Sequence, residues 1–337
     1  MKRIRSSPPG VLCLLAAVLA GLFLVSFYLG RYGVDVFTTC RILLSPLLGE
    51  GNWTANEYTA VINVRLPRIL LACLVGCCLA SAGAAYQGVF QNPMASPDVL
   101  GASSGAAFGA ALAILLGLGN SGVTLSAFFW SLVTVAVVYL IGQRAPGERV
   151  LNLVLSGMII SSLFTAATSY LKLVADPTNQ LPEITYWLMG SLSGTRLRDV
   201  LYILPVMALG LVPLFFLRWK LNLLTLGDDE ARTMGVNAPR LRLGVVLCAT
   251  LVTAASISVS GMIGWVGLVV PHLCRKLVGS NFKWLLPCAM LAGAAFLLLV
   301  DDISRNLLAT EIPIGILTAF TGAPFFLYLM MRKGENN

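Results

Sequence analysis

Residues 69–89 have the sequence ILLACLVGCCLASAGAAYQGV and contain no charged side chain. A helix needs about 20 mostly apolar residues to cross roughly 30 Å of hydrocarbon, so this stretch is long enough to span a lipid bilayer. The rest of the chain has the same character, because 57% of its 337 residues are hydrophobic and only 11% are charged. A soluble domain carries roughly 25% charged residues, so the sequence predicts an integral membrane protein.

Outward from this stretch, the apolar pattern predicts an all-α fold with about ten membrane spans in one transmembrane domain, residues 1–337. The eighth span is short and rich in glycine and proline, which favours a broken or tilted helix. The spans are predicted near residues 11–30, 69–89, 99–119, 123–143, 150–172, 199–217, 241–260, 261–274, 284–304 and 312–331.

The basic residues predict the orientation of the chain. Ten spans place both termini on one side, and the loops of that side hold fifteen of the 23 lysines and arginines, against eight on the other. The positive-inside rule therefore places both termini in the cytoplasm. The same distribution accounts for the net charge of +8, and the absence of long basic runs argues against nucleic-acid binding.

No catalytic constellation or metal site is predicted, so the chain is not expected to be an enzyme. Its single histidine is His272, and most of its eight cysteines lie in apolar runs, where cysteine packs as a small hydrophobic residue. A phosphate-binding P-loop needs a Gly-Lys pair, and this sequence has none. If ATP drives the protein, a separate subunit must bind it.

An ion-coupled secondary transporter is the alternative from another class. Such carriers place a titrating carboxylate inside the membrane despite its cost. The centres of the predicted spans are free of charge, and the nearest charged residues sit at span ends, namely Asp98, Lys172, Asp301 and Asp302. This pattern argues against ion coupling.

The longest cytoplasmic loop, 218–242, carries clear helix signals. Asp228-Asp229-Glu230 follows Gly227 and would fill a first helical turn, Gly235 can end the helix, and Pro239 prevents its continuation. The sequence predicts a short surface helix over 228–234. On the opposite side the longest loops are 31–66 and 173–198, and Tyr186-Trp187-Leu188-Met189 in the second predicts a short interfacial helix.

Several blocks of sequence follow one another over about residues 60–331. They are RLPR (65–68), QNPMASP (91–97), LGASSGA (100–106), YWLMGSL (186–192), LGDDEAR (226–232) with MGV (234–236), GWVGLVVPH (264–272), and IPIG (312–315) with GAP (322–324). These blocks resemble the FecCD-type permeases of ABC importers for ferric siderophores, heme and cobalamin, which include the vitamin B12 permease. The resemblance implies the type II ABC importer fold.

The resemblance also implies partners and a location. The chain would form a homodimer in the bacterial cytoplasmic (inner) membrane, with the translocation pathway at the dimer axis. Two ATP-binding cassette subunits would bind ATP and magnesium on the cytoplasmic face, and a substrate-binding protein would dock outside. No cofactor is expected in the chain itself.

The same resemblance assigns roles to specific residues. Coupling to the ATPase is assigned to the segment 226–236, through Leu226, Gly227, Asp228, Asp229, Glu230, Ala231, Arg232, Met234 and Gly235. A cytoplasmic gate is assigned to Asn92, Met94, Val150 and Leu151. An exposed basic rim that docks the binding protein is assigned to Arg65, Arg68 and Arg305. The expected cargo is a ferric siderophore or another iron complex, with heme, cobalamin and molybdate as alternatives.

Overall fold

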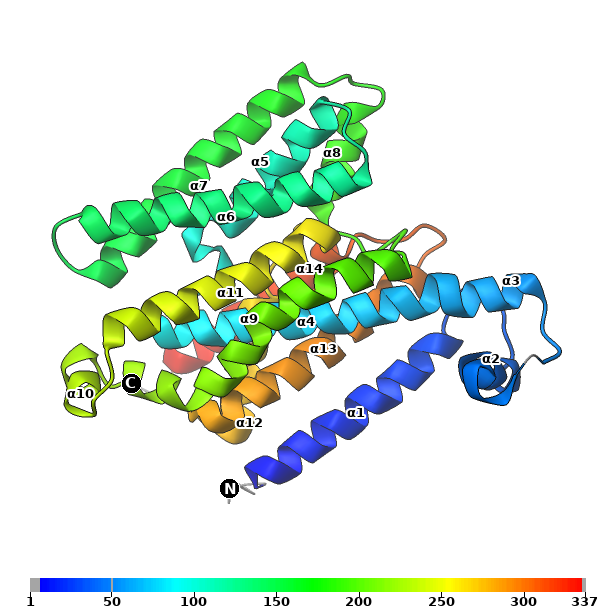
Figure 1. Cartoon of the computed structure of the whole chain (residues 1–337), viewed down its shortest axis with the longest axis horizontal. Coiled ribbons are helices and arrows are strands. Elements are labelled where there is room, and N and C mark those ends of the chain that lie inside the picture. The colour runs from blue at the N-terminus through cyan, green and yellow to red at the C-terminus, as the bar shows by residue number, and fades with distance from the viewer. Residues whose placement is uncertain (1–6, 50, 335–337) are drawn as a thin grey trace.

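Helices make up the fold over the residues that the computed structural model describes, 7–49 and 51–334, and no strand occurs among them (Figure 1). The long helices are α1 (Pro8–Tyr28), α4 (Leu66–Val89), α6 (Asn120–Arg144), α7 (Arg149–Val174), α9 (Leu197–Leu224), α11 (Ala238–Ser260), α13 (Phe282–Asn306) and α14 (Ile314–Gly334). The short ones are α2 (Val36–Leu48), α3 (Ala55–Tyr58), the π-helix η1 (Thr59–Arg65), the 3-10 helix η2 (Pro97–Leu100), α5 (Ala102–Leu115), α8 (Gln180–Met189), α10 (Asp228–Thr233) and α12 (Val266–Val278).

The predicted all-α membrane fold is confirmed. Seven of the described helices are long and apolar enough to cross a membrane, and three apolar helices are shorter. Each of the ten predicted spans overlaps a helix. The eighth is displaced from its predicted range of 261–274, because residues 261–265 are not helical and α12 continues to Val278.

The segment 31–66 contains helices that the sequence analysis did not anticipate. The carboxylate of Asp35 accepts a hydrogen bond from the Phe37 amide at 3.0 Å and so caps α2. Thr54 and Glu57 form a reciprocal capping box at the start of α3. The chain then runs without a break through η1 into α4, so the helix of the second span begins at Ala55, fourteen residues before the predicted start at residue 69.

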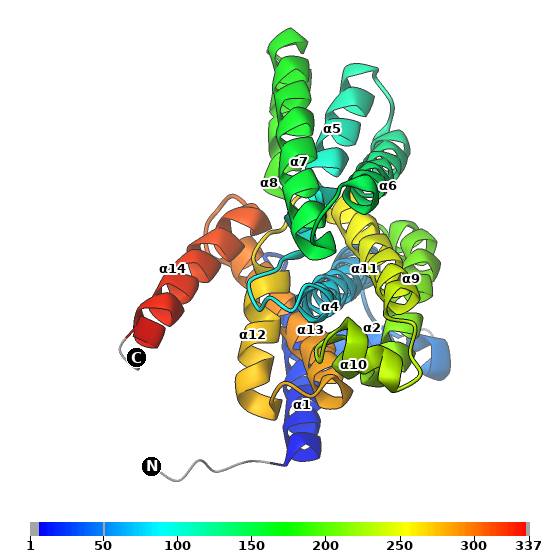
Figure 2. The ribbon, with the colours of Figure 1, turned by 90° about the vertical axis from the view of Figure 1, so that its left-hand side faces the viewer.

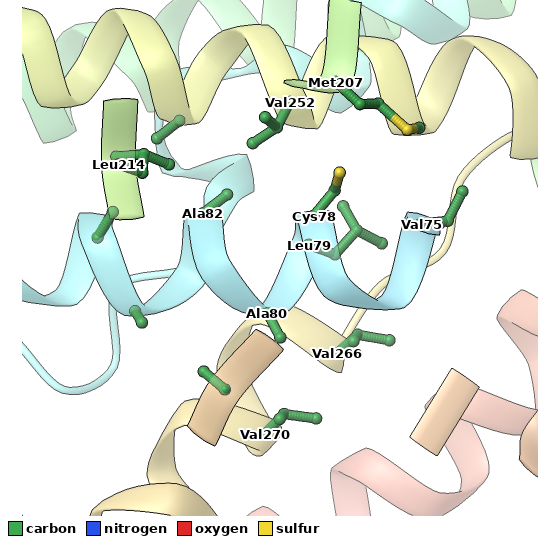
Figure 3. Packing of buried hydrophobic residues seen from close by; sticks show 14 of the residues in the cluster. Val75, Cys78, Leu79, Ala80, Ala82, Met207, Leu214, Val252, Val266 and Val270 are labelled. Carbon is green, nitrogen blue, oxygen red and sulfur yellow. The ribbon is translucent and has the colours of Figure 1, made fainter. Parts of the chain in front are cut away.

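Helix α4 is the centre of the fold, and small residues allow its neighbours to approach closely. In Figure 3 its side chains Val75, Cys78 and Ala82 face α9 and α11, and Ala80 points to the opposite side, where Gly293 of α13 approaches it closely. A Cβ atom added to Gly83 would lie 1.8 Å from the backbone oxygen of Gly267, where only glycine fits. The small residues of this span therefore serve helix packing.

The molecule has two distinct ends along its long axis (Figure 1). Helix α10 lies at one end, called here the α10 end. The starts of α3 and α4 and the helix α8 lie at the other, called here the α8 end. Helices α5 to α8 form a layer on one side of α4 and α11, and α14 stands away from the bundle in the view of Figure 2.

Candidate functional site

The helix predicted over 228–234 is present as α10, and glycines define both of its ends. Gly227 and Gly235 have φ angles of +123° and +77°. Residues with side chains rarely adopt these angles, so glycine allows the chain to turn into and out of α10. The Gly235 amide donates to the carbonyl of Arg232 at 2.9 Å, and the Val236 amide donates to that of Ala231 at 3.0 Å. These two hydrogen bonds end the helix, so the segment 226–236 is a compact helical turn with a defined conformation.

One small side chain holds α10 against the body, while larger apolar ones face outward. Ala231 is fully buried where α10 packs on the adjoining ends of α9 and α11. Leu226 and Met234, at the two ends of the segment, are 54% and 59% exposed. Leu226 and Met234 thus leave apolar surface at both ends of the turn that another protein could cover.

The loop between α4 and η2 contains the first predicted gate residues. Asn92 and Met94 are both exposed, and the Asn92 side-chain oxygen accepts a hydrogen bond from the Met94 amide at 2.9 Å, which forms a tight turn. The preceding residue, Gln91, donates from Nε2 to the carbonyl oxygen of Leu224 at 2.7 Å. The loop that contains the predicted gate residues, called here the gate loop for that prediction, is therefore bonded to the last residue of α9, just before the 226–236 segment.

The second predicted gate element lies at the start of α7. Leu151 is exposed, and Val150 is half-buried against the main core. Helix α7 packs on η2, because a Cβ atom added to Gly157 would lie 2.0 Å from the carbonyl oxygen of Val99. The two predicted gate elements are thus connected through η2.

The expectation that Arg65, Arg68 and Arg305 are exposed is wrong, and their docking role stays a prediction. All three are buried at the α8 end, with only 4% to 7% of each residue exposed. Arg65 donates to the backbone oxygen of Phe27 at 2.6 Å and also to that of Tyr32, so it ties η1 to the end of α1. A buried arginine needs hydrogen-bond acceptors inside the protein, and each of these arginines has them.

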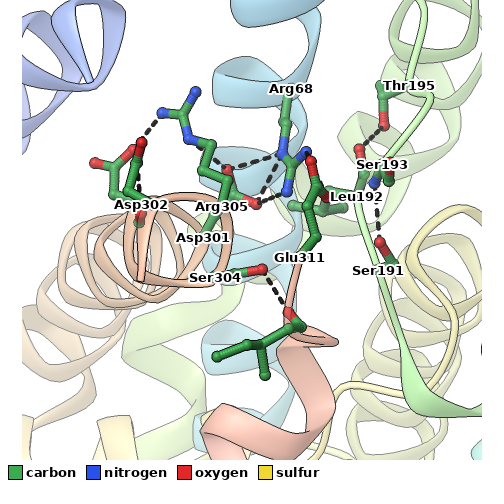
Figure 4. A network of polar contacts seen from close by, with 12 residues as sticks. Arg68, Ser191, Leu192, Ser193, Thr195, Asp301, Asp302, Ser304, Arg305 and Glu311 are labelled. Carbon is green, nitrogen blue, oxygen red and sulfur yellow. Dashed lines mark hydrogen bonds and ion pairs between the residues drawn. The ribbon is translucent and has the colours of Figure 1, made fainter. Parts of the chain in front are cut away.

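Arg68 and Arg305 belong to a cluster of five charged residues, called here the ion cluster (Figure 4). Arg68 binds Asp301 of α13 at 3.0 Å and both oxygens of Glu311 at 2.9 Å. Arg305 lies 3.7 Å from Asp301 and pairs closely with Asp302. The cluster joins α4, the end of α13 and the segment before α14, so these arginines hold helices together.

Sequence reasoning missed the acidic half of this cluster. Asp301 and Asp302 were interpreted as charges at a span end, yet both are buried. A signal was available, because Arg305 follows them by four and three residues and so shares a helix face with both. Nothing in the sequence pointed from Arg68 to Asp301, which is 233 residues away.

Among the described residues, no group of three histidine, cysteine or carboxylate side chains lies close enough together to hold a metal ion. A recess between α4, η2 and α12 contains Asp98, whose carboxylate accepts a hydrogen bond from the hydroxyl of Ser103. Trp265 lines the same recess with a left-handed φ of +70°.

Comparison with known proteins agrees with this architecture. The FecCD transport family matches residues 17–332. The molybdate import system permease protein MolB of Haemophilus influenzae is 40% identical, over 98% of each chain. A probable iron chelatin permease of Helicobacter pylori is 40% identical over 81% of this chain and 82% of its own length. The hemin permease HmuU of Yersinia pestis is 40% identical over 81% and 84%.

Solved structures show the same fold. An inward-facing ABC transporter assigned to the metal-chelate type superposes with a TM-score of 0.86 at 38% identity, covering 96% of this chain and 99% of that one. PsaBC from Streptococcus pneumoniae shares the fold alone, with a TM-score of 0.55 at 19% identity. The chain belongs to the FecCD transport family, whose members are membrane permease subunits of ABC importers.

Proposed function

We propose that this chain is the permease subunit of an ABC importer that carries an iron chelate into the cytoplasm, and that the segment 226–236 couples it to the ATPase. The family match over residues 17–332 carries the proposal. Relatives named for iron chelatin, hemin and siderophores support iron as the metal. Two ATPase subunits, a second copy of the chain and an extracytoplasmic binding protein complete the proposed assembly.

The coupling role is supported by the surface of α10. Leu226 and Met234 present exposed apolar side chains, and Ala231 and the two glycines fix the turn that carries them. Changing Leu226 and Met234 together to glutamate should abolish co-purification of the ATPase subunit, since an apolar contact surface would become doubly charged. Leu308, which is similarly exposed at the α8 end, provides the control: Leu308→Glu should leave the ATPase bound. Unchanged binding in the double variant would contradict the coupling role.

We also propose that the α10 end faces the cytoplasm, as the basic residues predict. Exposed sites are available at both ends for single cysteines in a background lacking the exposed Cys13 and Cys40. Asn179→Cys should react in intact cells with a thiol reagent that cannot cross the membrane, and Thr225→Cys should react only after the membrane is opened. Labelling of Thr225→Cys in intact cells would reverse the orientation.

Molybdate is the second candidate cargo, because the molybdate permease matches this chain from end to end while the iron relatives match about four fifths of it. The two cargoes are distinguished by uptake into cells that contain the complete importer. The proposal expects ATP-dependent accumulation of a radiolabelled iron chelate that excess molybdate does not reduce. Accumulation of molybdate without that of the iron chelate would overturn the iron assignment and leave the importer assignment intact.

A further inference from the structure

Gln91, the residue after the C-cap of α4, has an unusual backbone conformation. Its φ is +49°, and it shares a left-handed φ with only one other non-glycine residue among those described, Trp265. A glycine would adopt this conformation without strain, whereas a glutamine adopts it at a cost. A residue kept at such a position is expected to contribute through its side chain.

The side chain of Gln91 makes one specific contact. Its Nε2 donates to the carbonyl oxygen of Leu224 at 2.7 Å, and Leu224 is the fully buried last residue of α9. The carbonyl oxygens of the last helical turn have no amide donor within their own helix, so they need donors from elsewhere. Gln91 supplies a donor from a residue 133 positions earlier, and thereby bonds the gate loop to the end of α9.

A second set of bonds fixes the same turn of α9 to α13. The Asn222 side chain accepts from the Phe282 amide at 2.9 Å and donates to the side-chain oxygen of Asn281 at 3.1 Å. The end of α9 is therefore held on two sides, by the gate loop and by the start of α13. Helix α10 begins four residues after Leu224, so the end of α9 lies between the coupling segment and the gate loop.

We propose that Gln91 is a positioning residue that transmits movement of the segment 226–236 to the gate residues Asn92 and Met94. A hydrogen bond of 2.7 Å weakens steeply once its atoms separate by more than about half an ångström. When the ATPase displaces α10 and the end of α9, the gate loop must therefore follow or lose this bond. The inference rests on the proposed coupling role of 226–236 and adds the residue that connects it to the gate.

The experiment compares two glutamines that make the same kind of bond at opposite ends of the molecule. Gln180 donates from Nε2 to the carbonyl oxygen of Leu115, the last residue of α5, at 3.2 Å. Methionine matches glutamine in length and lacks the donor, and it incurs the same backbone cost at φ +49°. Lysine at position 91 retains a donor. The informative variants are thus Gln91→Met, Gln91→Lys and the control Gln180→Met.

Cargo transport and ATP hydrolysis are measured in the same proteoliposomes containing the complete importer. Gln91→Met should lower the cargo moved per ATP about fivefold, the factor expected for one lost hydrogen bond. Gln91→Lys should recover most of this loss, and Gln180→Met should leave the ratio unchanged. A second readout follows the gate directly: the labelling rate of Asn92→Cys should respond to ATP in the parent protein and lose that response when Gln91→Met is added.

A transport ratio for Gln91→Met equal to that of the parent, or equal losses in both methionine variants, would overturn the inference. The Leu226→Glu/Met234→Glu variant separates it from the proposed function. If that variant loses the ATPase while Gln91→Met transports normally, only the role of Gln91 fails. If that variant keeps the ATPase bound, the coupling role itself fails.

Discussion

The two ends of this permease are held together by different chemistry. At the α8 end, charged side chains join the helices: the buried Arg68 and Arg305 bind the buried Asp301 and Asp302, and Arg68 also binds the more exposed Glu311 before α14. At the α10 end, neutral amide contacts join α4, α9 and α13 through Gln91, Asn222 and Asn281.

This difference indicates which end can move within one subunit. Separating a buried ion pair leaves an uncompensated charge in a medium that solvates it poorly, and this costs several kcal/mol. Breaking a neutral hydrogen bond costs only about 1 kcal/mol, because neither partner is left as an uncompensated charge. The α8 end should therefore stay fixed, while the α10 end rearranges when the ATPase acts on it.

The largest expected effect comes from Asp301→Asn, which keeps the shape of the residue and removes the buried charge that faces both arginines. Its removal should lower the free energy of unfolding by about 3–5 kcal/mol. Thermal unfolding in detergent measures the change. Glu311→Gln is the matched control, because Glu311 is 35% exposed and its loss should cost about 1 kcal/mol or less. Equal effects of the two variants would contradict a buried structural role for the cluster.

A smaller loss of folding stability is expected for Arg65→Met. The variant keeps most of the apolar stem and leaves the carbonyls of Phe27 and Tyr32 without their charged donor. We expect about 2 kcal/mol of destabilisation, within the range for hydrogen bonds to a charged group. Denaturant unfolding should detect it. A transport defect with unchanged stability would instead return Arg65 to a docking role.

At the α10 end, Asn222→Ala should cost about 1 kcal/mol, since it removes two neutral hydrogen bonds from a turn that water can reach. Asn222→Asp keeps the acceptor for the Phe282 amide and should be milder. Thermal unfolding of both variants tests the contrast with Asp301→Asn directly. If Asn222→Ala lowered the free energy of unfolding as much as Asp301→Asn does, the distinction between the two ends would be removed.

The smallest effect is local. Gly235→Ala places a side chain at φ +77°, which should destabilise the turn by about 1 kcal/mol and speed amide exchange in 226–236 without lowering the unfolding temperature of the whole protein. Gly244 is the control, because it lies inside α11 with open space around it, and alanine there should be neutral or slightly stabilising. Unchanged exchange in Gly235→Ala would show that α10 does not depend on this turn.

Most of the fold could be predicted because its signals are local. Apolar length predicted where the long helices lie, and glycine and acidic residues predicted α10 to within one residue at its end. The capping signals of α2 and α3 were also local, but they stood in a loop that was interpreted only as an outside segment.

The ion cluster could not be predicted in the same way. The Arg68–Asp301 pair spans 233 residues, and the Gln91–Leu224 bond spans 133. Pairings over such separations depend on how the helices pack, and that packing depends on glycine contacts such as Gly83 against Gly267. In the sequence, a single arginine at a span end is equally consistent with an exposed docking residue and with one partner of a buried ion pair.

The claim that the α10 end moves while the α8 end stays fixed is tested most directly by amide hydrogen exchange. The complete importer is compared with and without a non-hydrolysable ATP analogue. Exchange should change in residues 90–96 and 222–236 and stay the same in 66–70 and 300–311. A change confined to the residues around Arg68 and Asp301, with none around Gln91 and α10, would contradict the account.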